Sequence, residues 1–194
     1  MTRKSTIDGS GMTGTWQILP AATAETLAPQ ITAAFRHRHE ACFRDSQAAH
    51  PHLGVELRDL RAVTGWWLGH LLTPIALYRI CIPTAIPAVP LPSGWTAAER
   101  AAHPCLALGP LLALSVPGLI GQGHLHYLCE LGHFLLQPEV QGLRRYPDAD
   151  AVFAAWGQVL SFRQQIRANL EKQQQWDRRA FLRRLMPTPK DSPL

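Results

Sequence analysis

The sequence predicts an α+β domain in which a small antiparallel sheet is flanked by an N-terminal helix and a long C-terminal helix. Two observations support this prediction. Apolar residues near each end of the chain recur at three- and four-residue steps, as on one face of a helix. The segment between them holds short apolar runs bounded by prolines and glycines, which are typical of strands. With 194 residues and 46% apolar content, the chain is expected to form one domain with tails.

The first helix is expected to run from about Glu25 or Pro29 to about Gln47. Proline is tolerated in a first helical turn, where its missing N–H would have no partner. The apolar positions that follow the helical period are Leu27, Ile31, Ala34, Phe35 and Cys42. Residues 1–20 are rich in Ser, Thr and Gly, and we expect them to form a mobile tail.

Two extended runs in the middle of the chain predict adjacent strands. Residues 66–72 read Trp-Trp-Leu-Gly-His-Leu-Leu and are closed by Thr73-Pro74, where proline removes a donor from the ladder. Residues 76–82 form a second run that Pro83 ends. Before them, residues 55–58 alternate as in a half-exposed strand.

The later elements are shorter. The proline-rich residues 83–95 predict a stiff extended loop, and residues 96–103 one or two helical turns. Residues 111–116 and 124–131 predict strands, separated by a glycine-rich turn. Alternation in the second strand places Leu125, Tyr127, Cys129 and Leu131 on one face and His124, His126 and Glu130 on the other.

A long helix closes the chain. Asp148 is a suitable N-cap, because its carboxylate can accept from a free N–H of the first turn. The helical period is kept by Val152, Phe153, Trp156, Val159, Leu160, Ile166 and Leu170. The polar residues 171–175 are expected to bend or interrupt it. We therefore expect three regions: a tail (1–20), an α+β domain (21–165) and a basic helical extension (166–194).

The net charge of +5 lies in the last quarter of the chain. Residues 144–194 carry ten basic and five acidic side chains, so they account for the whole excess. A basic helix could bind nucleic acid or a membrane surface. However, the chain has only three lysines and no known nucleic-acid motif. We predict no nucleic-acid partner and interpret the helix as a solvated face or a docking arm for a protein.

Neither a membrane span nor a secretory signal is expected, because no apolar stretch is long enough and the basic N-terminus precedes no apolar core. This predicts a cytoplasmic protein without stable membrane insertion. The four cysteines are far apart and include no C-x-x-C pair. In a cytosolic chain, they are most simply buried free thiols.

No catalytic motif is present: there is no Gly-rich phosphate loop and no G-x-S-x-G. The sequence therefore predicts neither an enzyme nor a bound cofactor. One alternative stays open, in which His124 and His126 hold a metal with Glu130 or His133, or act with Cys129 in redox handling. A solvated polar sheet face is the simpler interpretation of the two histidines.

Four stretches resemble HybE-type [NiFe]-hydrogenase assembly chaperones, a family that includes HupJ- and HoxT-like proteins. They are residues 33–35 of the first helix, His50-Pro51 leading into 55–56, the Trp-Leu-Gly and Leu-Thr-Pro groups of 67–74, and Gly121 to Phe134 with its Tyr-x-Cys-x-Leu. The resemblance spans about residues 30–165. The chain departs from the family's usual pattern at two places: Ile75 replaces an aromatic residue, and a Ser-Pro pair is missing after Leu131. These differences bear on which partner is bound more than on which fold is formed.

The resemblance implies an accessory protein rather than a catalyst. Its implied partners are a hydrogenase small-subunit precursor with a twin-arginine signal peptide, the large subunit, and other hydrogenase accessory proteins. The partner-binding residues expected on this basis are Trp66, Trp67, Gly69, Thr73, Pro74, Tyr127, Cys129 and Glu130. Acids for two arginines would come from Glu56, Asp59 or Glu130.

Overall fold

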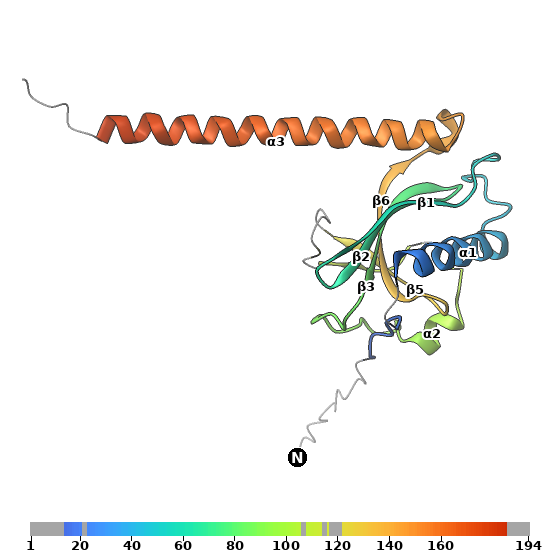
Figure 1. The fold of residues 1–194 in the computed structure, drawn as a ribbon. Helices are drawn as coiled ribbons and strands as arrows, with labels where there is room; N and C mark the ends of the chain where they lie inside the picture. The colour runs from blue at the N-terminus through green and yellow to red at the C-terminus, as the bar shows by residue number, and fades with distance from the viewer. Residues whose placement is uncertain (1–13, 21–22, 106–107, 114–115, 117–121, 186–194) are drawn as a thin grey trace, which may run out of the picture. The chain divides into compact units, whose positions relative to one another are not determined.

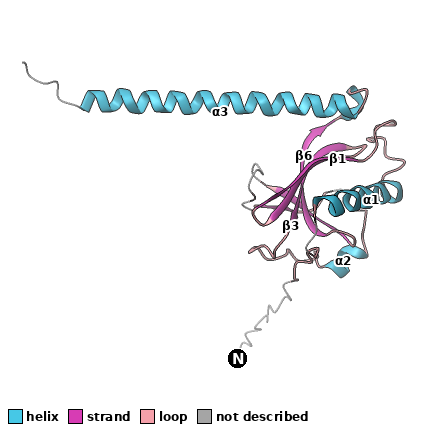
Figure 2. Ribbon diagram, viewed as in Figure 1, coloured by secondary structure: helices cyan, strands magenta, loops and turns pink. Residues whose placement is uncertain are grey.

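The computed structural model describes residues 14–20, 23–105, 108–113, 116 and 122–185. Within them, the chain forms an antiparallel sheet with a helix near each end, which confirms the predicted α+β class (Figures 1 and 2). The elements are α1 (Ala24–Cys42), β1 (Glu56–Val63), β2 (Trp66–Leu72), β3 (Ala76–Pro83), α2 (Ala97–Ala101), β4 (Leu111–Leu112), β5 (Gly123–Leu128), β6 (Gly132–Gln141) and α3 (Ala149–Leu185), with a 3-10 turn at Leu143–Arg145.

The strands of the described residues form a single sheet with the order β1-β2-β3-β6-β5-β4. All five pairs are antiparallel. β1, β2 and β3 form a meander, and β5 and β6 form a hairpin. The β3–β6 pair joins these two parts, so β1 and β4 are the edge strands.

β6 is the element that the sequence analysis missed. Its apolar run is only Phe134 to Leu136, and a proline follows closely at Pro138, which argues against a central strand. The structure accommodates this proline at an irregularity in the pairing with β3. Tyr78 pairs with Pro138 and Leu77 with Val140, so Glu139 is the extra residue of a bulge.

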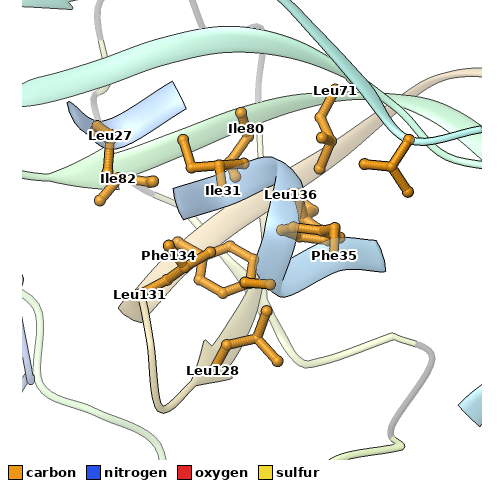
Figure 3. Close-up of a cluster of buried hydrophobic side chains, with 12 residues drawn as sticks. Leu27, Ile31, Phe35, Leu71, Ile80, Ile82, Leu128, Leu131, Phe134 and Leu136 are labelled. Atoms are coloured by element: carbon orange, nitrogen blue, oxygen red, sulfur yellow. The ribbon is translucent and has the colours of Figure 1, made fainter. Parts of the chain in front are cut away.

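One face of the sheet packs against α1, as Figure 3 shows. The cluster consists of buried side chains from α1, the segment before β1, β2, β3, β5, the β5–β6 turn and β6: Leu27, Ile31, Ala34, Phe35, Val55, Leu71, Ile80, Ile82, Leu128, Leu131, Phe134 and Leu136. The rings of Phe35 and Phe134 meet edge to face, with centroids 5.7 Å apart. The predicted apolar face of α1 is thus the face that contacts the sheet.

The other face of the sheet is covered by loops and by the segment before α1. Here the buried side chains are Trp16, Trp66, Leu68, Cys81, Leu91, Trp95, Leu112, Val116, Leu125 and Leu135. The indole N–H of Trp16 donates to the carbonyl of Val89 at 2.7 Å. Residues 14–20, expected as part of a mobile tail, therefore contain a core tryptophan; residues 1–13 lie outside the described residues.

The prediction of four free, buried thiols is wrong. Cys42, the last residue of α1, forms a disulfide with Cys105, which follows α2. Cys81 is a buried free thiol as expected, but Cys129 is free and exposed. The sequence contains no signal for the pairing, because the two half-cystines are 63 residues apart and meet only when the chain after α2 returns to the end of α1.

α3 begins as predicted. The N–H of Ala151 donates to Oδ1 of Asp148 at 2.8 Å, which is the expected N-cap hydrogen bond. The helix then continues to Leu185, so residues 171–175, which were expected to bend or interrupt it, do not interrupt it. A second compact unit begins at Phe153 and holds most of α3. Within the described residues, no helix is both long and apolar enough to span a membrane.

Candidate functional site

Trp66 and Trp67 start β2 and point to opposite faces of the sheet. Trp66 is buried in the loop-covered cluster, whereas the half-buried Trp67 packs against the cluster under α1. Both residues line a cavity of about 460 Å³ at the β1–β2 turn. Val63 from β1 and Ile82 from β3 are among the other apolar residues that line it. The cavity is large enough to hold an apolar side chain of a partner.

Thr73 and Pro74 lie at the opposite end of β2 and have a structural role there. Oγ1 of Thr73 accepts from the N–H groups of Ile75 and Ala76 at 3.3 and 3.2 Å. The carbonyl of Pro74 accepts from the N–H of His50 at 2.7 Å. Two of the stretches that resemble the chaperone family, His50-Pro51 and residues 67–74, are therefore in direct contact in the fold.

Gly69 lies in the middle of β2 and faces β1. A Cβ at this position would be 3.1 and 3.3 Å from the Cδ1 atoms of Leu57 and Leu60. The glycine therefore lets these two leucine side chains lie over the strand. Its place inside the sheet makes it a packing residue of the structure.

Tyr127, Cys129 and Glu130 belong to the β5–β6 turn region. The Tyr127 hydroxyl donates to Oε1 of Gln17 at 2.8 Å, and the carbonyl of Glu130 accepts from Nε2 of Gln30 at 2.6 Å. β5 ends at Leu128, so the alternation predicted through Leu131 stops there. This is why Cys129 is exposed rather than in the core.

The Cys129 thiol is not activated. Its hydrogen bond with the Glu130 side chain, followed by burial, raises the pKa of the Cys129 thiol above its ordinary value. A thiol with a raised pKa is protonated near neutral pH and is a weak nucleophile. The environment of Cys129 gives no support to the redox alternative.

The eight residues expected to bind a partner do not form one site. The strand registers place Trp66–Trp67 and the β5–β6 turn at the same end of the sheet. Thr73–Pro74 lie at the other end, near the close of β6. The candidate surface at the first end includes the tryptophan cavity and the adjoining edge of β1.

The two histidines of β5 are not on a solvated face. His126 is 2% exposed and stacks on Phe134, with ring centroids 5.7 Å apart. Nδ1 of His124 lies 2.7 Å from the carbonyl of Gly109. His133 points to the other face, between the Gln17 N–H and the Trp95 carbonyl. No group of metal-ligating side chains occurs among the described residues.

Burial lowers the pKa of His126 to about 3, and the charges of Arg38 and His124 add to this effect. We therefore expect stability to decline in acid. Above pH 6.5, His126 is neutral in both the folded and the unfolded chain, so it does not make the free energy of unfolding depend on pH. Below that pH, the unfolded chain binds a proton that the native state rejects, so the free energy of unfolding falls by about 1.4 kcal/mol per pH unit, or about 2 kcal/mol at pH 5.

Chemical denaturation at pH 7 and pH 5 measures this loss. In His126→Phe, which keeps a flat ring beside Phe134, the contribution of His126 to the acid loss should vanish. The pKa of His133 is also lowered by burial, so some decline remains in the variant. Identical pH profiles for the two proteins would show that His126 does not contribute.

A second cavity, of about 490 Å³, lies between the end of α1 and the ends of β3 and β6. Its wall includes Phe35, Tyr78, Leu136 and Leu143. Arg38, which is only 9% exposed, also lines it. The sequence analysis missed this arginine, although Ile31, Phe35 and Arg38 share one helix face and Arg38 thus interrupts an apolar stripe.

A charged cluster is buried elsewhere in the sheet. Glu139, at the bulge of β6, places Oε2 2.6 Å from Nδ1 of His70 and Oε1 2.8 Å from a terminal nitrogen of Arg79. The side chain of Glu139 is 3% exposed. Its two contacts compensate for the burial of its charge and tie β6 to β2 and β3.

The second compact unit shows an exposed apolar stripe on α3. Its members are separated by three or four residues and are 41–64% exposed: Val159, Phe162, Ile166 and Leu170. These spacings place the four side chains on one helix face. Such a face is suited to packing against another apolar element.

The described residues thus form an antiparallel sheet that is covered on both faces and has a cavity at each end. A family model described as [NiFe]-hydrogenase assembly, chaperone, HybE matches residues 26–184. Since the match covers most of the chain, the protein belongs to this family of hydrogenase assembly chaperones. The matched region includes the six strands of the described residues and nearly all of α3, and so extends beyond the residues that carry the sequence resemblance.

A solved structure is also similar. The solution structure of HybE from Escherichia coli aligns with 86% of this chain and 83% of its own, at 18% identity and a TM-score of 0.43. No curated protein matches the chain.

Proposed function

We propose that this chaperone holds the precursor of a hydrogenase small subunit, with its twin-arginine signal peptide, in the cytoplasm during cofactor assembly and before export. The family match over residues 26–184 is the observation that supports a hydrogenase client. In this proposal the protein acts by binding, together with other hydrogenase accessory proteins, and catalyses no reaction.

The edge of β1 is the surface that best fits an extended signal peptide. β1 is an edge strand of the sheet, so a peptide can add to it through main-chain hydrogen bonds. Its pairing with β2 shifts register between Arg58 and Arg61, and Asp59 lies in this irregularity with its side chain exposed. The tryptophan cavity opens beside the far end of the same strand and can accept an apolar side chain.

Among the acids considered for the two arginines, Asp59 is the best placed. Glu56 already pairs with Arg58 at 2.6 Å, and Glu130 lies on the β5–β6 turn away from β1. A carboxylate on an edge strand can pair with an arginine of an added peptide strand. We therefore assign the arginine contact to Asp59.

Removing the charge of Asp59 should weaken binding of a labelled twin-arginine signal peptide. Asp59 has a positive φ of 56°, which asparagine also tolerates, so Asp59→Asn preserves the backbone. An exposed ion pair contributes about 0.2–1 kcal/mol, so the dissociation constant should rise roughly 1.5- to 5-fold. Fluorescence anisotropy of the labelled peptide measures this change.

Asp45→Asn is the matched control, since Asp45 is exposed in the turn after α1 and the variant loses the same charge. Binding by this variant should equal that of the original protein. An equal loss in both variants would assign the effect to net charge and contradict a site on β1.

A pull-down from cells that mature a hydrogenase tests the client itself. Recovery of a small-subunit precursor that still carries its signal peptide supports the proposal. Recovery of the large subunit alone would assign the chaperone to the other client, and recovery of no hydrogenase component would contradict the proposal.

The exposed stripe of α3 favours a protein partner over nucleic acid for the C-terminal helix. Binding to phosphates depends on cationic side chains, whereas Val159, Phe162 and Ile166 offer an apolar face. This surface could contact an apolar stretch of the same client. Capture that persists in high salt is the expected behaviour of such a contact, because charge-driven binding weakens steeply with salt.

A further inference from the structure

The cavity at the end of α1 combines apolar walls with positive charge. Leu136, Pro138 and Leu143 form one side of it, and Arg38, His39 and Arg144 supply basic groups. Among the described residues that line the cavity, none is acidic. Its volume of about 490 Å³ is in the range of sites that bind ligands or several side chains of a peptide.

The cation of Arg38 is held in an unusual position. Its guanidinium carbon lies 6.0 Å from the ring centroid of Phe35 and 5.5 Å from that of Phe43. Two aromatic faces thus orient the charged group. The side chain is 9% exposed, although a charged group loses favourable hydration when it is buried.

Burial and the charge of Arg38 also shift the pKa values of titratable groups in this region. Burial lowers the pKa of Arg38, and burial raises the pKa of the Tyr78 phenol that lines the same cavity. The charge of Arg38 also helps to lower the pKa of His126. An incoming carboxylate would therefore meet a positive potential in a medium where charge-assisted hydrogen bonds are strong.

We propose that this cavity binds an apolar peptide segment that carries a carboxylate, with the carboxylate on Arg38 and apolar side chains against Leu136 and Leu143. The charge preference is opposite to that of a twin-arginine motif, so the segment is a second element, distinct from the one assigned to β1. The inference rests on the proposed function in one respect: the segment is taken to belong to the hydrogenase client.

Three capped, labelled peptides test the chemistry. They share a Leu-Phe-x-Leu core and differ only in having Asp, Asn or Lys at x. The Asp peptide should bind about tenfold more tightly than the Asn peptide, as expected for one charge-assisted hydrogen-bonded contact, and the Lys peptide should bind least. Equal binding of the three would overturn the proposal.

Two arginine variants test whether Arg38 causes the preference for the Asp peptide over the Asn peptide. Arg38→Met removes the charge and keeps an apolar side chain in the cavity, and it should abolish the preference for Asp over Asn. Arg36→Met is the matched control, since Arg36 is exposed on the same helix and does not line this cavity. A preference that survives Arg38→Met, or that disappears equally in Arg36→Met, contradicts the assignment.

A third variant guards against a folding defect in Arg38→Met. Leu108 lines the cavity and is 51% exposed, so Leu108→Glu should be tolerated by the fold and adds a negative charge at the mouth. It should weaken the Asp peptide several-fold and leave the Asn peptide unchanged. No change for the Asp peptide would contradict binding in this cavity.

A carboxylate can reach the cavity either on a peptide or on a free apolar acid. Octanoate, an apolar acid without a peptide, distinguishes these two ligands. Binding of octanoate without binding of the Asp peptide would overturn the proposal in favour of a free amphiphile. The peptide assay is also independent of client capture. Failure of the peptides with capture of the precursor would refute only this inference, and the reverse result would refute only the proposed client.

Discussion

Phe134→Ala is expected to lower the free energy of unfolding by about 3–5 kcal/mol. Phe134 is fully buried in β6, beneath α1, and contacts the rings of both Phe35 and His126. Truncation to alanine removes its apolar contacts and leaves a cavity that the packed neighbours can only partly fill. Chemical denaturation followed by tryptophan fluorescence measures the change.

Phe162→Ala is a suitable comparison, because Phe162 is 64% exposed on α3. Its truncation should change the free energy of unfolding by no more than about 0.5 kcal/mol. If both variants lost a similar amount, the contacts of Phe134 would not account for its effect.

Reduction of the Cys42–Cys105 disulfide is expected to lower the free energy of unfolding by about 4 kcal/mol. The bond joins residues 63 apart, and closing so long a loop removes much conformational freedom from the unfolded chain. Denaturation of the oxidised protein with and without a reductant measures this contribution. The double variant Cys42→Ala/Cys105→Ala should match the reduced protein.

Cys129→Ser is the control for loss of a thiol, since Cys129 is exposed and outside the bond. It should remain sensitive to the reductant, whereas the double variant should not. Equal midpoints for oxidised and reduced protein would contradict a stabilising disulfide. Disulfides are rare in the cytosol, so the state of this bond in cells also bears on the proposed location.

The sequence predicted correctly those elements that can be recognised from a short stretch of residues. The run from Trp66 to Leu72 is β2 in the structure, with the predicted bounds. The N-cap at Asp148 is formed by a single side chain and the next turn of backbone. Periodicity and capping are local, so they can be recognised without knowing what the chain packs against.

The features that were missed depend on contacts between distant segments. Pro138 is unfavourable in a central strand, and it is accommodated only by the bulge in the pairing of β6 with β3. His126 was expected on a polar face, but α1 and β6 bury that face. The Cys42–Cys105 bond likewise depends on how the loop after α2 returns to α1.

The candidate site was only partly predictable for the same reason. Trp66 and Trp67 were identified as apolar, and they do line a cavity, but the sequence did not show that Thr73 and Pro74 lie at the other end of the sheet. The cavity around Arg38 draws on α1, β3 and β6 together. No short stretch of the chain contains a pattern for it.

The pairing of β3 with β6 has a consequence for synthesis on the ribosome. β1, β2 and β3 emerge as a meander of local hairpins, but β6, which pairs with β3, is the last of the described strands to be made. Pairing of such distant strands is slow, because a long loop must close before any contact forms. Until then β3 is an unprotected sheet edge, which can template wrong pairing. We therefore expect the nascent chaperone itself to need shielding until β6 has left the exit tunnel.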